Sequence, residues 1–237
     1  MSILYFDIET IPGQRAGIRE AIAETITPPG NMSKQDTIDR WVIEQKPALV
    51  DAAYARAGLK GSTGEVMCIS WALDNMPTQS AYRTDLDPYS EEKVLLAFFA
   101  ILNDLPRSGG RPTFVGHNIV NFDLRFLWQR AVVCGVKPSG VIPFKAKPWD
   151  DTVFDTMVAW TGSNREYIKQ DDLCAALGLP MKDGVDGSKV WGLAQDCAFE
   201  AIRTYCEQDV EAVRRMYKRM NFIADPVAAK SDCDIPF

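Results

Sequence analysis

The sequence has little histidine and no paired cysteines. His117 is the only histidine, and the six cysteines include no Cys-x-x-Cys pair. Because zinc sites are built mainly from cysteine and histidine, this shortage argues against a zinc site. Scattered cysteines are typical of reduced thiols, and no signal-peptide pattern or apolar run of about 18 residues is present. We therefore expect a cytoplasmic protein, of bacterial or phage type, without a transmembrane helix.

Basic charge is also scarce. The chain has 26 lysines and arginines against 32 acids, which gives a net charge of −6 and a pI near 4.9. This balance argues against nucleic-acid binding through a broad basic surface. It does not exclude a nucleic-acid enzyme, because a metal site lined by carboxylates itself contributes negative charge. The length and the hydrophobic content of 46% suit one α/β domain with an elaboration, or at most two small domains.

The order of elements predicts a mixed sheet covered by helices on both faces. We expect strands from residue 3 to about Thr10 and at 64–73, 79–84, 112–118 and 152–156. Helices are expected at 90–102, 121–135, 171–180 and 199–220. Residues 14–58 read as helical and are interpreted as an insertion after the first strand. The last residues, 223–237, resemble a flexible acidic tail.

Two acids lie in the first expected strand, within ILYFDIETIP (3–12). Asp7 and Glu9 are two residues apart, so their side chains share one face of the strand. Buried carboxylates are costly unless a partner compensates their charge. The simpler interpretation is a strand end that reaches solvent, which is common for one acid and less so for two.

Two later segments carry further candidate residues. Asp123 follows a buried strand and begins a helix, near the inward face of that helix. In the last helix, YCEQD (205–209) places Tyr205 and Asp209 four residues apart, so they project together beside the apolar stripe. Glu207 and Glu211 are expected to face solvent. Converging acids bind hard divalent ions through oxygen, and two ions about 4 Å apart support phosphodiester cleavage.

Three motifs together resemble a known superfamily. FDIET, GHNIVNFD and YCEQD are similar to the exonuclease motifs of the DnaQ-like, or DEDD, 3′–5′ exonucleases. The resemblance implies a ribonuclease H-like α/β fold, with a mixed five-stranded sheet flanked by helices, over residues 1–222 apart from the insertion. It also implies that two Mg²⁺ or Mn²⁺ ions are bound by four acids and that a tyrosine positions the attacking water. These residues are Asp7, Glu9, Asp123 and Asp209 for the metals, and Tyr205 for the water.

The resemblance is to the tyrosine branch of the superfamily. The other branch has a histidine five residues before the last aspartate, and this chain has Thr204 there. The residues around the motifs, including GHN and DGSKV, most resemble those of stand-alone relatives of the family B DNA polymerase exonuclease domain. By this resemblance, Asn118 would contact the substrate or shape the site, and Phe122 would contact the substrate.

Four other polar residues near the motifs are given lesser roles. His117 is expected to be structural. Asp155 ends an expected strand and is interpreted as a cap of the next segment. Lys182 and Lys189 lie in or beside a Gly-rich loop, where some relatives have a lysine that approaches a phosphate, but neither spacing supports a catalytic role.

The chain ends in Asp234, Ile235, Pro236 and Phe237. This ending resembles the C-terminal tip of bacterial single-stranded-DNA-binding proteins, which docks into basic, apolar pockets of replication and repair proteins. The aromatic ring would fill such a pocket while the carboxylates meet basic residues. We therefore expect partners that recognise that tip; an ordinary disordered tail is the alternative.

The leading functional prediction is a metal-dependent 3′–5′ exonuclease acting on single-stranded or frayed DNA 3′ ends, in replication, repair or recombination. A 3′–5′ exoribonuclease is an alternative, because the scissile chemistry is the same. A non-catalytic adaptor that binds DNA ends or partners is another. The complete set of acids with Tyr205 argues against the adaptor.

Overall fold

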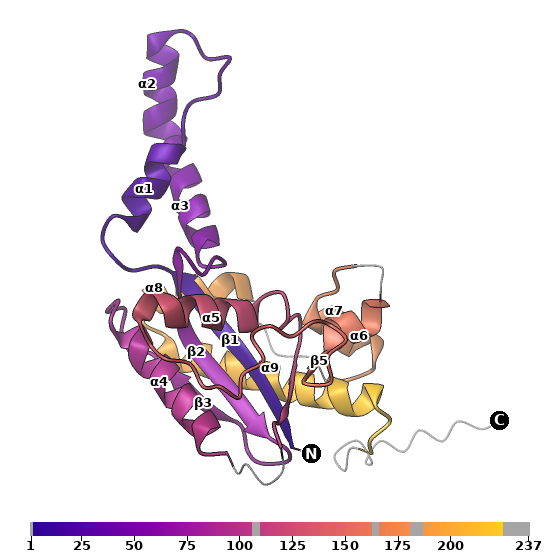
Figure 1. Cartoon of the computed structure of the whole chain (residues 1–237). Coiled ribbons are helices and arrows are strands. Elements are labelled where there is room, and N and C mark those ends of the chain that lie inside the picture. The colour runs from indigo at the N-terminus through magenta and orange to yellow at the C-terminus, as the bar shows by residue number, and fades with distance from the viewer. Residues whose placement is uncertain (1, 106–109, 163–165, 181–186, 225–237) are drawn as a thin grey trace, which may run out of the picture.

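A mixed five-stranded sheet forms the centre of the structure, a computed structural model that describes residues 2–105, 110–162, 166–180 and 187–224 (Figure 1). The strands are β1 (Ile3–Pro12), β2 (Gly64–Leu73), β3 (Gln79–Tyr82), β4 (Thr113–Gly116) and β5 (Val153–Asp155). Their spatial order is β3-β2-β1-β4-β5. The two pairs β1–β2 and β2–β3 are antiparallel, whereas β1–β4 and β4–β5 are parallel. The prediction of a mixed sheet is thus confirmed.

Strand β1 is central and longer than expected. It continues past Thr10 to Pro12, because Pro12 still pairs with Gly64 of β2. The register shifts between Glu9 and Thr10, which face Cys68 and Val66 respectively. Such an irregularity bends a strand and re-aims its side chains, and it lies here directly beside the two acids of the first motif.

Helices cover both faces of the sheet. They are α1 (Ile18–Thr25), α2 (Gln35–Glu44), α3 (Lys46–Ala57), α4 (Ser90–Asn103), α5 (Asp123–Cys134), α6 (Thr156–Thr161), α7 (Gln170–Ala176), α8 (Val190–Gln195) and α9 (Phe199–Met220), with a 3₁₀ turn at Gly187–Lys189. Even-numbered residues of β1 such as Phe6 pack in one core cluster with residues of α4 and α5. Odd-numbered residues such as Tyr5 and Ile11 pack on the opposite face, with residues of α7, α8 and α9.

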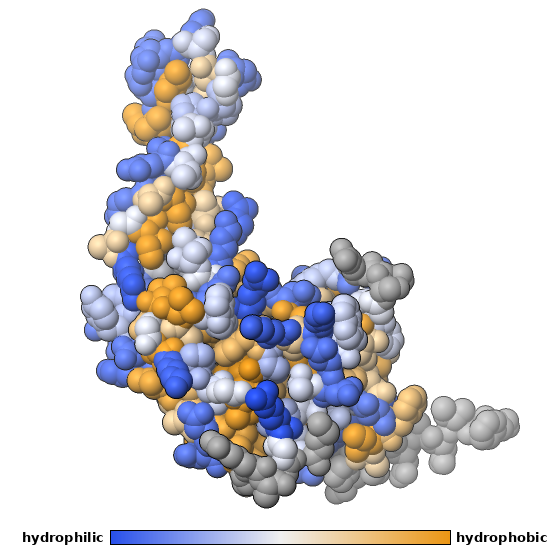
Figure 2. Space-filling model, viewed as in Figure 1, coloured by the Kyte–Doolittle hydropathy of each residue, from blue (hydrophilic) through white to orange (hydrophobic). Residues whose placement is uncertain are grey.

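The helices α1 to α3, between β1 and β2, project from one end of the sheet (Figure 1). We call residues 14–58 the arm. Its helices bury only Trp41, Val50 and Ala57, whereas α9 alone buries eight residues. Hydrophobic and hydrophilic residues are mixed over its visible surface (Figure 2). The arm is therefore held mainly by contacts among its own helices and at its base.

Two buried ion pairs lie near the base of the arm. Arg83 donates to Glu65 at 2.8 Å, and Arg130 donates to Glu91 at 2.6 Å. Glu65 also accepts a 2.8 Å hydrogen bond from the backbone N–H of Gln14, where the arm leaves β1. These contacts tie the first turn of the arm to β2 and its neighbours.

None of the described helices is both long enough and apolar enough to cross a membrane. Of the expected tail, only Ile223 and Ala224 are described. The predicted docking residues Asp234, Ile235, Pro236 and Phe237 lie outside the described residues, as does Lys182.

Candidate active site

A cavity of about 500 Å³ lies beyond the carboxyl end of β4, beside the part of β1 that continues past that end. Ligands commonly bind outside the carboxyl ends of parallel strands, because the loops that follow those strands diverge there. The cavity is lined by Asp7, Ile8, Glu9, Thr10, Leu59, His117, Asn118, Phe122, Asp123, Tyr167, Lys169, Gln170, Asp171, Gly187, Ser188, Tyr205 and Asp209. All seven residues predicted to be catalytic or to contact substrate are therefore brought to one place.

Asp7 and Glu9 project from the face of β1 that is covered by α9. Glu9 is buried, and atoms of the two carboxylates lie within 4.8 Å of each other and of the Cys206 sulfur. The Cys206 thiol approaches the backbone oxygen of Asp7 at 3.5 Å and its Oδ2 at 3.6 Å. Burial raises the pKa of Cys206 well above its usual value, so it remains a thiol at neutral pH. Because thiolates rather than thiols bind metals, the carboxylates are the better ligands in this group.

Asp123 begins α5 and is 3% exposed. Its Oδ1 accepts a 3.2 Å hydrogen bond from the backbone N–H of Ile8, so the carboxyl group is held against β1 between the two acids of the first motif. Burial, and then the nearby charge of Asp7, raise the pKa of Asp123 well above its usual value. A cation at this site would reverse that effect, because it would favour the charged form of each carboxylate.

Tyr205 and Asp209 lie on the face of α9 that is turned toward β1, and both are buried. Asp209 Oδ1 accepts a 2.7 Å hydrogen bond from the side-chain amide of Gln170 in α7. The Tyr205 hydroxyl lies beside the turn at Gly187, where an added β-carbon would be 4.0 Å away. The last helix thus presents a phenol and a carboxylate to the same cavity.

The turn after β4 is held by an acid that does not line the cavity. Asp155 Oδ1 accepts from the backbone N–H of Asn118 at 2.9 Å, and its Oδ2 accepts from that of Val120 at 3.1 Å. It also accepts from two amides of α6, so the prediction of a capping role is confirmed. Asn118 has a φ of 62°, a left-handed conformation that asparagine tolerates better than most residues.

The His117 ring is held on both sides within this turn. Nδ1 lies 2.9 Å from Thr156 Oγ1, and Nε2 lies 2.9 Å from the backbone oxygen of Ile168. These contacts join three segments around the cavity and agree with the expected structural role. Gly116, just before the histidine, has no room for a side chain, because a β-carbon would lie 2.0 Å from Ile119 Cγ2.

The four predicted metal-binding acids are not equally close together. Among the described residues, Asp123 and Asp209 are outside the group within 4.8 Å that includes Asp7 and Glu9. They line the same cavity from α5 and α9. Carboxylate oxygens are the ligands that Mg²⁺ and Mn²⁺ prefer, so the set of donors fits such ions.

Among the lining residues that were not singled out from the sequence, four come from one segment. Tyr167, Lys169, Gln170 and Asp171 come from the start of α7 and the segment before it. The segment 171–180 was interpreted only as a helix, although its first acid could have been considered for the site. Lys189 does not line the cavity.

Comparisons with known proteins point to one family. Residues 65–232 match the family described as a predicted 3′–5′ exonuclease related to the exonuclease domain of PolB. The matched range begins at β2, so it does not include Asp7 and Glu9. A search of curated proteins finds no match.

A solved structure is similar over most of the chain. It is the family B DNA polymerase from the hyperthermophilic archaeon Pyrobaculum calidifontis, with a TM-score of 0.59 and 16% identity. The match covers 93% of this chain and 24% of the polymerase chain. This likeness confirms the predicted α/β fold of ribonuclease H-like type. The chain spans about a quarter of the length of the polymerase that it matches.

Proposed function

Because this chain belongs to the family of predicted 3′–5′ exonucleases related to the exonuclease domain of PolB, we propose that it hydrolyses DNA from 3′ ends in a metal-dependent reaction. The proposed substrates are single-stranded or frayed ends, and the proposed catalytic domain is residues 1–222 with its insertion at 14–58. The observation that carries the proposal is the convergence of Asp7, Glu9, Asp123, Tyr205 and Asp209 on one cavity.

The donor set supports a site for two divalent ions, Mg²⁺ or Mn²⁺. Asp7, Glu9, Asp123 and Asp209 would hold them. Burial first, and then the nearby charge of Asp7, raise the pKa of Asp123. When bound, the ions would supply positive charge that offsets these carboxylates and stabilises the attacking and leaving oxygens. This explains why a protein would keep such acids together at the expense of stability.

The remaining residues would position water and substrate. In the proposed reaction, the oxygen of water attacks the phosphorus that links the last two nucleotides, and the bond from this phosphorus to the 3′ oxygen of the shortened strand breaks. The water gives up a proton, that 3′ oxygen takes one up, and a nucleoside 5′-monophosphate leaves. The Tyr205 hydroxyl would orient the attacking water. Asn118 would contact the terminal nucleotide, and Phe122 would pack against its base or sugar. Gln170 holds the Asp209 carboxylate by its 2.7 Å hydrogen bond and so limits its rotation.

The first test follows the length of a 5′-labelled single-stranded DNA with time. We expect shortening from the 3′ end with Mg²⁺ or Mn²⁺, and none with EDTA or in Asp7→Ala. Asp172→Ala is the matched control, because Asp172 is an exposed acid of α7 that does not line the cavity. Activity that survives both EDTA and Asp7→Ala would reject the proposal.

Two variants of the test refine it. Tyr205→Phe keeps the ring but removes the hydroxyl, and we expect a fall in kcat of about 10- to 1,000-fold with little change in KM. An RNA oligonucleotide of the same sequence tests the exoribonuclease alternative. If RNA is shortened faster than DNA, RNA becomes the proposed substrate, and the proposed phosphodiester hydrolysis is unchanged.

For the C-terminal tail, we propose docking to proteins that recognise the tip of single-stranded-DNA-binding protein. Support comes from the sequence alone, in the acidic and apolar character of Asp234 to Phe237. Removal of these four residues should abolish binding to such a protein, measured by calorimetry, without a change in nuclease rate on a short oligonucleotide. Unchanged binding after the removal would contradict the tail's role.

A further inference from the structure

A second cavity adjoins the acid-lined one. Its volume is about 880 Å³, and Asn118 and Tyr167 line both cavities. Its lining consists of Asn118, Asn121, Pro148, Trp149, Met157, Val158, Thr161, Gly162, Glu166 and Tyr167. The two hollows are therefore neighbours on either side of Asn118 and Tyr167, so that a chain with its end in the first could extend toward the second.

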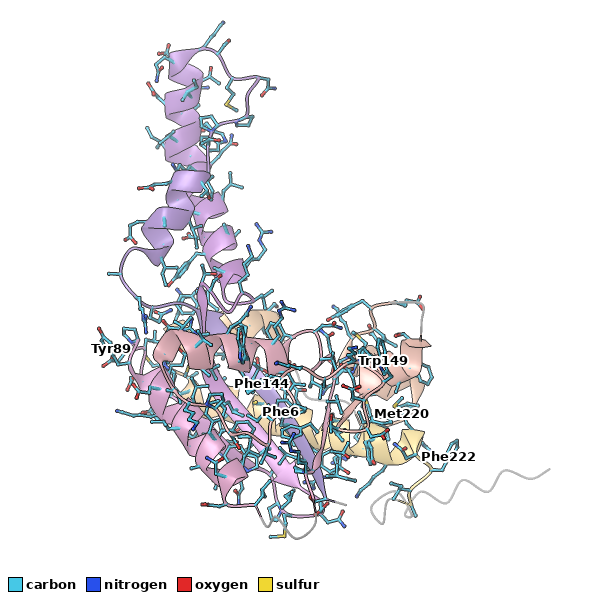
Figure 3. All side chains as sticks on the ribbon, viewed as in Figure 1. Phe6, Tyr89, Phe144, Trp149, Met220 and Phe222 are labelled. Atoms are coloured by element: carbon cyan, nitrogen blue, oxygen red, sulfur yellow. The ribbon has the colours of Figure 1, made fainter. Side chains whose placement is uncertain are left out.

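Two exposed aromatic rings belong to this second cavity. Trp149 is 75% exposed and Tyr167 is 69% exposed, although large aromatic side chains are usually well buried. Trp149 belongs to the segment that leads into β5, at the same side of the molecule as α6 and α7 (Figure 3). Lys147 Nζ lies 5.6 Å from the centre of its ring, which places a positive charge at this aromatic side chain. Aromatic rings left in water beside a candidate nuclease site suggest that they stack on a ligand.

We propose that Trp149 and Tyr167 form a stacking platform for the bases of single-stranded nucleic acid whose 3′ end lies in the acid-lined cavity. This inference rests on the proposed function, because it assigns a path to the substrate of the same site. Stacking suits a nuclease that removes any nucleotide, since every base presents a flat π face and no base-specific hydrogen bond is needed.

The charges around the platform suit a nucleic acid despite the chain's net charge of −6. Glu166 is the only charged residue lining the second cavity among those described, so bases rather than phosphates fit its interior. Lys147 lies against Trp149, and Lys169 lines the first cavity. A third hollow of about 330 Å³ shares Leu59 and Phe122 with the first, and Lys60 and Arg125 line it. Phosphates leaving the acid-lined cavity would therefore meet positive charge on either side.

The binding test uses fluorescence anisotropy with 5′-labelled DNA and RNA oligonucleotides of about 2 to 12 nucleotides, in EDTA so that no cleavage occurs. We expect Trp149→Ala or Tyr167→Ala to raise Kd for the longer oligonucleotides by about 5- to 100-fold. Trp149→Ala should leave Kd for the shortest nearly unchanged, whereas Tyr167→Ala should weaken the binding of every length, because Tyr167 lines both cavities. Trp149→Phe and Tyr167→Phe keep a ring and should retain most of the affinity.

Trp160→Ala is the matched control. Trp160 is also an exposed tryptophan, at 48%, and lies on α6, but it does not line the second cavity. The Trp160→Ala variant should bind oligonucleotides of every length with the same Kd as the wild type. Equal affinity of Trp149→Ala, Tyr167→Ala and the wild type for every length would overturn the inference. A change in self-association in place of oligonucleotide binding, seen by sedimentation, would also overturn it and indicate a protein interface.

A small substrate separates this inference from the proposed function. The p-nitrophenyl ester of thymidine 5′-monophosphate occupies only the acid-lined cavity, so Trp149→Ala should hydrolyse it at the wild-type rate with Mn²⁺. If the wild type neither hydrolyses this ester nor shortens DNA, the proposed function fails while the binding test still judges the platform. If the wild type does both and Trp149→Ala degrades long and short DNA with unchanged KM, only the platform fails.

Discussion

Two regions of the molecule bury carboxylates, and they differ in the charge that lies next to each carboxylate. Near the base of the arm, Glu65 and Glu91 each face an arginine, at 2.8 and 2.6 Å. In the cavity, burial first, and then the nearby charge of Asp7, raise the pKa of Asp123. The arginine-paired acids join elements of the fold to one another. The repulsion between cavity acids weakens the metal-free fold, and under the proposed function a bound cation would offset their charge.

The charge of the neighbouring side chain, rather than the degree of burial, therefore distinguishes the structural acids from the candidate functional acids. Glu91 and Asp123 are buried to a similar degree, at 0% and 3% exposure. Exchange of each carboxylate for its amide should therefore move stability in opposite directions. The predictions below use that contrast, beginning with the largest effect.

Asp123→Asn should lower nuclease activity by on the order of 1,000-fold or more while raising the stability of the metal-free protein. The amide can still accept the hydrogen bond from Ile8, but it removes the charge that opposes Asp7. Steady-state cleavage and thermal unfolding in EDTA measure the two effects. A variant that loses both activity and stability would show that Asp123 is a structural acid like Glu91.

Arg130→Met should lower the free energy of unfolding by about 3–5 kcal/mol, because it leaves Glu91 charged and buried without its arginine. Glu91 also accepts from the backbone N–H of Val66 at 2.8 Å, so Glu91→Gln is the milder partner change. The double variant should recover part of the loss, as measured by urea unfolding. If the losses in free energy of unfolding are additive in the double variant, the interaction between Arg130 and Glu91 contributes little to stability.

The stability of the metal-free protein should fall as pH rises above about 4, the usual value for an aspartate. Because the pKa of folded Asp123 is raised, the unfolded chain releases this proton first, so ionisation favours unfolding until the folded pKa is passed. Added Mn²⁺ should offset this loss by about 3 kcal/mol at a concentration of 100 Kd. Thermal unfolding from pH 4 to 8, with and without the ion, checks both statements.

In Asp123→Asn the fall with pH should be smaller than in the wild type. Identical pH profiles for the two proteins would assign the loss to other groups. A stabilisation by Mn²⁺ that is as large at pH 4 as at pH 8 would argue against binding through ionised carboxylates.

Cys134 gives the smallest predicted effect, within the Glu91 network. Burial, and then the charge of Glu91, raise its pKa to about 12 from the usual 9.0. Its contribution to stability is therefore complete below pH 9 and is lost between about pH 9 and 12. At pH 8.5, iodoacetamide should modify the exposed Cys197 well before Cys134, as followed by peptide mass spectrometry. Equal rates would show that the thiol is not held as described.

Much of the fold follows from patterns that are local in the sequence. The strand 64–73 and the helix 199–220 have the expected bounds, because clear apolar periodicity and turn residues mark their ends. The extension of β1 past Thr10 was missed, since it depends on pairing with Gly64, far along the chain. Glu207 and Glu211 were expected to face solvent, but they accept hydrogen bonds from Ser80 and Thr78 at the edge of β3.

The candidate site was predictable where a motif marked it. The three motifs identified the five residues that line the cavity from β1, α5 and α9. Tyr167, Lys169 and Trp149 stand in segments without regular structure, and no spacing rule relates such residues to a distant strand. Their place beside the site depends on the tertiary packing of the segments that lead into β5 and α7.

The packing of the last helix on the first strand means that the cavity can be completed only late in synthesis. Residues of α9 complete the cavity on β1, and the contact of Cys206 with Asp7 joins positions 199 residues apart. While α9 has not yet emerged from the ribosome, the cavity of the nascent chain is without Tyr205 and Asp209. Under the proposed function, the unfinished polypeptide would be unable to attack nucleic acid, including the ribosomal RNA beside which it is made.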